Sequence, residues 1–169
     1  MSNPLPDQGL WDTFVEAKRQ LHRRQAEFYQ QASDRQAVLR AALDPGAGAW
    51  QQGTAFDFLT AFPSDVIPLL PEVFRWATKS ERWAGPAREV IARIPRGKRT
   101  TLLELLFLEQ LEAAEDDDYP NLAELAPRCE AWRLLERLVQ QAANNDDPKV
   151  LELAEHYNAT YAPKWQPKQ

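Results

Sequence analysis

Few side chains in this sequence have the chemistry for catalysis. The 169 residues include two histidines, His22 and His156, and a single cysteine, Cys129. A cysteine or serine nucleophile needs a base within hydrogen-bond reach, and no local motif brings Cys129 close to either histidine. We interpret Cys129, which follows Pro127 by two residues, as a semi-buried small hydrophobic residue. The sequence therefore suggests no catalytic residue and predicts a protein that is not an enzyme.

Two acidic runs could be considered as cation sites. They are Glu115-Asp116-Asp117-Asp118 and Asn144-Asn145-Asp146-Asp147. A calcium loop needs a glycine at its sharp turn and a closing glutamate, and the first run lacks both. Carboxylates also stabilise the N-terminus of a helix, so we interpret both runs as helix caps. The glycine spacing of Arg96-Gly97-Lys98-Arg99 does not match a phosphate-binding loop. We expect no metal and no cofactor.

The densest positive patch in the chain comprises Arg93, Arg96, Lys98 and Arg99. The net charge is −5, distributed as 0, +3 and −8 over residues 1–50, 51–100 and 101–169. An acidic C-terminal half repels a phosphate backbone at long range, which argues against nucleic acid as the partner. A single cysteine, no signal segment and no long apolar run predict a cytoplasmic protein without a membrane partner.

A strongly apolar segment, residues 100–115, is predicted to form a central helix around which the other helices are organised. Its apolar residues cover most of a helical circumference: Leu102, Leu103, Leu105, Leu106, Phe107, Leu108 and Leu111. A helix of this kind is expected to be covered on several sides. Thr101 and Glu104 have the spacing of a capping box and predict where the helix begins.

Three prolines, Pro86, Pro120 and Pro148, are each predicted to be the first residue of a helix, where the missing N–H costs nothing. When the chain is aligned on them, an apolar stripe recurs on the preceding helix: Leu69, Val73 and Ala77, then Leu103, Phe107 and Leu111, then Ala131, Leu135 and Val139. Two further columns follow the prolines, one of Ile91, Leu125 and Leu153 and one of Ala92, Ala126 and Ala154. The pattern predicts three helix pairs: 65–79 with 85–94, 101–115 with 118–126, and 131–143 with 147–159. Pro71 is expected to mark the start of the first helix.

The turn Asp146-Asp147-Pro148-Lys149-Val150 resembles the Asp-Pro-x-Val turn between the two helices of a HEAT repeat. Gly85-Pro86-Ala87-Arg88 occupies the same place in the first pair, and the resemblance covers residues 64–160. It departs from HEAT repeats in its shorter period and in the middle turn, Asp117-Asp118-Tyr119-Pro120. The resemblance implies an all-α protein of antiparallel helix pairs, stacked as a short α-solenoid. It also implies kinship with short bacterial interaction modules, some of which are immunity-like partners of toxins.

The predicted organisation is one compact domain with five parts. They are a disordered start at 1–8, an N-terminal helical segment at 9–43 with a long helix over 9–32, an aromatic connector at 44–63, the three HEAT-like pairs at 64–160, and a tail at 161–169. The aromatic side chains of the connector, including Trp50 and Phe56, are expected to dock against neighbouring helices. A short helix could cover 54–62.

The preferred functional prediction is a non-catalytic helical-repeat module that binds a protein partner, as an immunity-like protein or an adaptor. Stacked helix pairs present a rigid surface, which loses little conformational entropy when it binds a partner. The predicted partner-binding residues, mostly on the second helices, are Trp83, Arg88, Arg93, Glu124, Arg128, Glu152 and His156.

Two alternatives remain open at this point. One is a nucleic-acid-binding protein that resembles HEAT-like alkyl-base DNA glycosylases. It would use the basic stretch from Arg88 to Arg99, with Trp76 or Trp83 and a carboxylate in a groove. The other is a structural subunit whose N-terminal helix pairs with its copy in a dimer. The sequence leaves the oligomeric state and the partner undetermined.

Overall fold

The computed structural model describes residues 6–166, and the regular structure among these residues is entirely helical. The predicted all-α class is therefore confirmed. The chain divides between Val38 and Leu39 into two compact units, where its length suggested one domain. Residues 1–5 of the expected disordered start and 167–169 of the expected tail lie outside the described residues.

The first unit is built on the long helix α1 (Gln8–Gln31), which was predicted from residue 9 to 32. No side chain of α1 is buried, and several of its apolar residues are more than half exposed: Leu10, Trp11, Phe14 and Leu21. Helix α2 (Arg35–Ala42) crosses the boundary between the units. Asp34 caps this helix as expected, since its carboxylate accepts a hydrogen bond from the backbone N–H of Ala37 (3.0 Å).

The predicted aromatic connector is largely a helix, α3 (Ala49–Ala61), which begins five residues before the short helix expected there. Phe56, Phe58 and Leu59 are buried, which confirms that this segment docks through its apolar side chains. Trp50 does not dock: it lies in the first turn of α3 and is 90% exposed.

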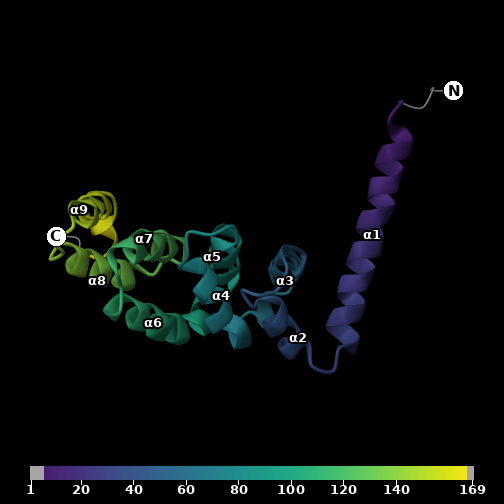
Figure 1. Ribbon diagram of the computed structural model, residues 1–169, viewed down its shortest axis with the longest axis horizontal. Coiled ribbons are helices and arrows are strands. Elements are labelled where there is room, and N and C mark those ends of the chain that lie inside the picture. The colour runs from purple at the N-terminus through teal and green to yellow at the C-terminus, as the bar shows by residue number, and fades with distance from the viewer. Residues whose placement is uncertain (1–5, 167–169) are drawn as a thin grey trace. The chain divides into compact units, whose positions relative to one another are not determined.

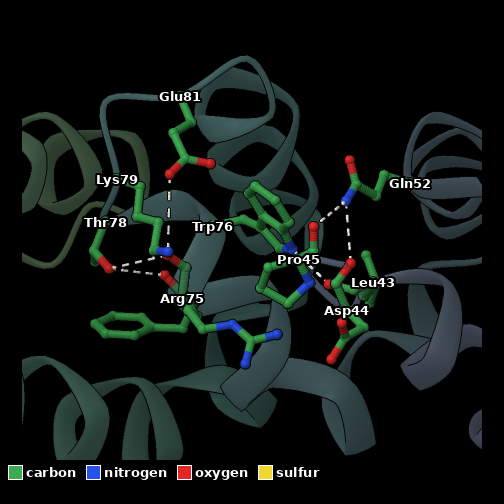
Figure 2. Close-up of polar contacts among 10 residues, drawn as sticks. Leu43, Asp44, Pro45, Gln52, Arg75, Trp76, Thr78, Lys79 and Glu81 are labelled. Carbon is green, nitrogen blue, oxygen red and sulfur yellow. Dashed lines mark hydrogen bonds and ion pairs between the residues drawn. The ribbon is translucent and has the colours of Figure 1, made fainter. Parts of the chain in front are cut away.

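Polar contacts fix the turn that joins α2 to α3 (Figure 2). The Gln52 amide donates to the carbonyl oxygens of Asp44 (3.0 Å) and Ala47 (2.8 Å). The indole N–H of Trp76 donates to the carbonyl oxygen of Leu43 (2.8 Å). These bonds satisfy carbonyl groups that would otherwise lie unpaired beside the core.

Six further helices occupy the segments predicted to form three pairs: α4 (Leu70–Ala77) and α5 (Ala84–Arg93), α6 (Arg96–Glu112) and α7 (Tyr119–Arg128), and α8 (Trp132–Ala142) and α9 (Pro148–Tyr161). The first and third pairs pack closely, whereas α7 packs more extensively on α8 than on α6. Short 3₁₀ turns η1 (Pro63–Asp65) and η2 (Ile67–Leu69) lead into α4, while η3 (Asp116–Asp118) precedes α7 and η4 (Ala162–Lys164) follows α9. Pro148 is the first residue of α9, and Pro71 and Pro120 are the second residues of α4 and α7, where the missing N–H costs nothing. Pro86 was also expected to be the first residue of a helix, but it is the third residue of α5, which begins at Ala84.

These helices lie in two layers (Figure 1). Helices α5, α7 and α9 contact one another in sequence on one side, and α3 continues this layer by packing on α5. Helices α4, α6 and α8 form the other layer. The apolar columns meet between the layers: Val73, Phe107 and Leu135 are at most 1% exposed. Ala92, Ala131 and Leu153 are the three members of the columns that are only partly buried.

The prediction for the central helix needs two corrections. Helix α6 begins at Arg96, after Pro95, so Thr101 and Glu104 lie inside the helix and do not form its capping box. It is also buried along a single stripe, Arg99, Leu103, Phe107 and Leu111, while Leu105 is 63% exposed. The reason is that α6 belongs to an outer layer, and neighbouring helices cover one of its sides.

Candidate functional site

Arg88 lies at the centre of a polar network between α4, α5 and α7. Its Nε donates to the carbonyl oxygen of Ala77 (2.8 Å), and its Nη2 donates to Oδ1 of Asn121 (3.0 Å). Its Nη1 forms an ion pair with the carboxylate of Glu124. Arg88 is only 6% exposed, so its guanidinium holds three helices together and is not accessible to a partner. Burial lowers the pKa of Arg88, and the Glu124 carboxylate opposes that shift.

Asn121 extends this network in both directions. Its Oδ1 also accepts a hydrogen bond from the hydroxyl of Ser80 (3.2 Å), and its Nδ2 donates to the carbonyl oxygen of Asp117 (3.3 Å). The turn after α4 is thereby tied to the beginning of α7. The outer side chain of the network, Glu124, keeps about half of its surface exposed (53%).

A row of aromatic side chains runs beside this network, mainly along α9. The rings of Tyr157 and Tyr161 stack with centroids 5.8 Å apart, and Tyr161 stacks in the same way on Trp132 (5.8 Å). The rings of His156 and Tyr157 meet edge to face, with centroids 5.4 Å apart. We call these four residues the aromatic row. Each is at least partly exposed, and the row therefore combines apolar area with polar tips at the surface.

Tyr157 connects the aromatic row to the polar network. Burial raises the pKa of its hydroxyl, the negative charge of Glu124 and the proximity of Tyr161 raise it further, and Arg88 opposes them. The phenol is therefore neutral near pH 7 and can donate a hydrogen bond.

Several of the predicted partner-binding residues lie on the α7 and α9 helices. Glu124 and Arg128 are exposed on α7, and Glu152 and His156 are exposed on α9. Arg93, at the end of α5, is exposed but contacts Glu89 (3.2 Å). The sequence did not reveal the aromatic row, although the spacing of Tyr157 and Tyr161 by four residues would place both on one helical face.

Trp83, one of the predicted partner-binding residues, has an internal role instead. Its indole N–H donates to Oε1 of Gln52 (2.9 Å), and its ring stacks on Phe56 with centroids 5.8 Å apart. Trp76, the other aromatic residue considered for a nucleic-acid groove, is 4% exposed. Both indole N–H groups thus bond to residues of the α2–α3 region, namely Leu43 and Gln52.

The basic patch is divided between the surface and the core. Arg93, Arg96 and Lys98 are exposed, whereas Arg99 is 6% exposed. Arg99 donates to the carbonyl oxygens of Ile94 (2.8 Å) and Cys129 (2.6 Å) at the C-terminal ends of α5 and α7. The guanidinium therefore satisfies carbonyl groups that two helix ends leave unpaired.

A pocket of about 470 Å³ lies where the beginnings of α6 and α8 meet η4. We call it the α6–α8 pocket. Its walls include Trp132 and Trp165, and its charged lining residues are Arg96, Arg99, Arg133, Lys164, Glu104, Glu130 and Glu136. Sequence reasoning missed this pocket because its residues come from three separate segments, 96–104, 129–136 and 164–165.

The acidic runs cap helices, as the sequence predicted. Asp147 accepts hydrogen bonds from the backbone N–H groups of Lys149 (2.7 Å) and Val150 (3.3 Å) at the start of α9. Glu115 and Asp118 form a reciprocal capping box around η3. No cluster of three potential metal-ligating side chains occurs within residues 6–166. No helix in that part of the chain is long and apolar enough to span a membrane.

Comparison with protein-family models, with curated proteins and with solved structures gave no match to this chain.

Proposed function

We propose that this protein is a non-catalytic helical-repeat module that binds a protein partner through the surface of α7 and α9. The observation that carries the proposal is the aromatic row of Trp132, Tyr161, Tyr157 and His156, which lies partly exposed beside charged groups of α7. Tyrosine, tryptophan and arginine are the residue types that contribute most often to binding energy at protein interfaces. We call the row together with Glu124 and Arg128 the α7–α9 surface.

The polar network behind this surface supports the proposal. Glu124 is held by the buried guanidinium of Arg88, and Arg88 is in turn fixed by Ala77 and Asn121. Tyr157 and Tyr161 are held by stacking on each other. Side chains that are already ordered lose little conformational entropy on binding, so more of the contact energy remains as affinity.

The kinship with HEAT-like proteins, including short bacterial immunity-like partners and adaptors, belongs to the same proposal. Three features favour it: the two layers of helices, the buried apolar columns between them, and the cap that Asp147 forms before Pro148. This architecture would present the α5, α7 and α9 layer as one continuous binding surface.

The proposal is tested by capture from a lysate of the source cell with the tagged protein, at about 0.15 M salt and with nuclease present. The decisive comparison is between the double variant Tyr157→Ala/Tyr161→Ala and the control Trp50→Ala. The control also removes aromatic area, but from a side chain that is 90% exposed on α3. Circular dichroism checks that both variants are folded.

We expect a stoichiometric partner that the wild type and Trp50→Ala retain and that the tyrosine variant loses by at least about tenfold. Loss of the partner with Trp50→Ala alone would place the interface on α3 and contradict the proposed surface. Recovery of nucleic acid, with proteins lost on nuclease treatment, would contradict the protein-binding function itself.

A further inference from the structure

We propose that the α6–α8 pocket binds a carboxylate attached to an apolar or aromatic group. The inference is independent of the partner-binding surface on α7 and α9. The volume of the α6–α8 pocket, about 470 Å³, is within the range of small-molecule sites. Two sources could supply this chemistry: a free apolar acid, or the C-terminal carboxylate of a peptide.

Positive charge converges on this pocket without carboxylate partners. Arg96, Arg133 and Lys164 line it and are exposed, and Arg99 lies behind them at 6% exposure. Among the described residues, none of these four cations has a carboxylate within ion-pair distance. The Nη1 and Nη2 atoms of Arg99 donate hydrogen bonds to backbone carbonyl oxygens. Carbonyl groups carry no net charge, so the positive charge of Arg99 is not neutralised. Arginine groups at the mouth of a pocket favour a planar anion, because they can donate two parallel hydrogen bonds to it.

The balance of charges indicates a monoanion. Glu104, Glu130 and Glu136 line the same pocket as the four cations, so its formal charge is one positive unit. A carboxylate neutralises that charge, whereas a phosphate near pH 7 adds more negative charge than the pocket can balance beside three glutamates. The pocket should therefore prefer carboxylate to phosphate.

The rest of the lining suits an apolar group. Leu103, Cys129 and Leu134 are 2%, 2% and 7% exposed and form its apolar floor. The indoles of Trp132 and Trp165 provide larger apolar surfaces, and the Nζ of Lys164 lies 5.4 Å from the centroid of the Trp132 ring. A ligand with an apolar body and one carboxylate would match both parts of the lining.

The backbone at Glu130 has an unusual conformation. Glu130 lines the pocket with φ of 51°, and it is the one residue other than glycine with positive φ among residues 6–166. This conformation favours glycine, and here it ends α7, since the N–H of Ala131 bonds to the carbonyl oxygen of Ala126 (2.9 Å). The glutamate therefore adds a carboxylate to the pocket at a cost in backbone energy.

The experiment titrates the ¹⁵N-labelled full chain with N-acetylphenylalanine and with N-acetylphenylalaninamide. The two probes share the same ring and differ in the carboxylate. We expect the acid to shift the indole N–H signals of Trp132 and Trp165 with a Kd on the order of 1 mM, and the amide to bind about tenfold more weakly. Equal binding of acid and amide, or no shift by about 10 mM acid, would overturn the proposal.

The variant Arg96→Gln/Arg133→Gln tests the cations, with Arg137→Gln/Lys149→Gln as its control, since each variant removes two positive charges and neither Arg137 nor Lys149 lines the pocket. Arg137 is exposed one turn further along α8. We expect the Arg96→Gln/Arg133→Gln variant to weaken binding of the acid about tenfold and the control to leave it within about twofold. Equal effects of the two variants, or tighter binding of inorganic phosphate than of the acid, would contradict the assignment.

A tetrapeptide that ends in phenylalanine, with a free or an amidated C-terminus, distinguishes the two sources. Tighter binding of the free-terminus peptide than of N-acetylphenylalanine would identify a peptide end as the ligand. Weaker binding of the peptide would identify a small acid. Either result supports the carboxylate site.

Discussion

The guanidinium of Arg88 on α5 forms an ion pair with the carboxylate of Glu124 on α7, although the two side chains differ greatly in exposure. The side chain of Arg88 is 7% exposed and that of Glu124 is 53% exposed. The pair thus has an internal cation, fixed by further hydrogen bonds to Ala77 and Asn121, and an anion at the surface. This asymmetry determines how the two partners should respond to mutation.

Arg88→Ala should lower the free energy of unfolding by about 2 to 4 kcal/mol, because it leaves the carbonyl oxygen of Ala77 without its donor, removes one of the two hydrogen bonds to Oδ1 of Asn121, and opens a cavity. Glu124→Gln should cost about 1 kcal/mol or less, since the carboxylate is half-solvated and an amide can still accept from Arg88. Urea unfolding of both variants checks this order. A larger loss for Glu124→Gln would contradict the assignment of Arg88 as the internal member.

Much of the helical arrangement could be predicted from the sequence because it depends on local signals. Pro71, Pro120 and Pro148 predicted the starts of α4, α7 and α9 to within one residue, whereas Pro86 lies two residues after the start of α5. The apolar columns predicted the buried stripes that include Val73, Phe107 and Leu135. The prediction that neighbouring helices cover α6 on several sides was wrong, because a helix rich in leucine can also lie in a layer that is covered on one side. Leu105 is left 63% exposed there, and no local signal distinguishes it from Leu103.

The candidate site was less predictable because it depends on contacts between distant segments. Exposure of Glu124, Arg128, Glu152 and His156 follows from helical periodicity. The burial of Arg88 does not follow from helical periodicity, because its partners Ala77 and Asn121 are 11 and 33 residues away in the sequence. The α6–α8 pocket likewise arises only when residues 96–104 and 129–136 are brought together with η4.

Glu130→Gly should leave the protein about 1 kcal/mol more stable than Glu130→Ala, because glycine adopts the left-handed conformation without a Cβ penalty. Both variants remove the same carboxylate, so the difference in their stability measures the cost of the backbone conformation at residue 130. Glu130 follows the last residues of α7, where the N–H of Ala131 bonds to the carbonyl oxygen of Ala126 (2.9 Å). Thermal unfolding of the two variants measures the difference, and equal stability would show that the backbone at this position carries no strain.

The stability of the protein should fall as the thiol of Cys129 ionises. Burial raises the pKa of this thiol to about 11 from its usual 9.0, while Arg99 and Arg128 oppose the shift. The folded state therefore holds the proton more tightly than the unfolded state. This contribution is fully present below about pH 9 and should be lost as the pH rises to about 11, at a cost of about 2 kcal/mol.

Cys129→Ala provides the comparison for this pH dependence. The variant should be less stable than the wild type at pH 8, because it loses a buried sulfur atom, but its stability should decline less between pH 9 and pH 11. Lysines and tyrosines titrate equally in both proteins, so the difference between the two declines isolates the thiol. Urea unfolding across this range gives the measurement, and parallel declines would contradict a raised thiol pKa.

Gly53→Ala should destabilise the protein by about 1 to 3 kcal/mol, whereas Gly97→Ala should be neutral or stabilising by up to about 0.5 kcal/mol. A Cβ on Gly53 in α3 would lie 2.8 Å from the Trp83 ring, and one on Gly97 in α6 would have nothing within 4 Å. The Trp83 ring cannot easily move away, because it bonds to Gln52 (2.9 Å) and stacks on Phe56. Chemical denaturation compares the two substitutions, and tryptophan fluorescence reports any displacement of Trp83. If both alanines stabilised the protein equally, the close packing of α3 against the start of α5 would be wrong, and with it the continuation of the helical layer through α3.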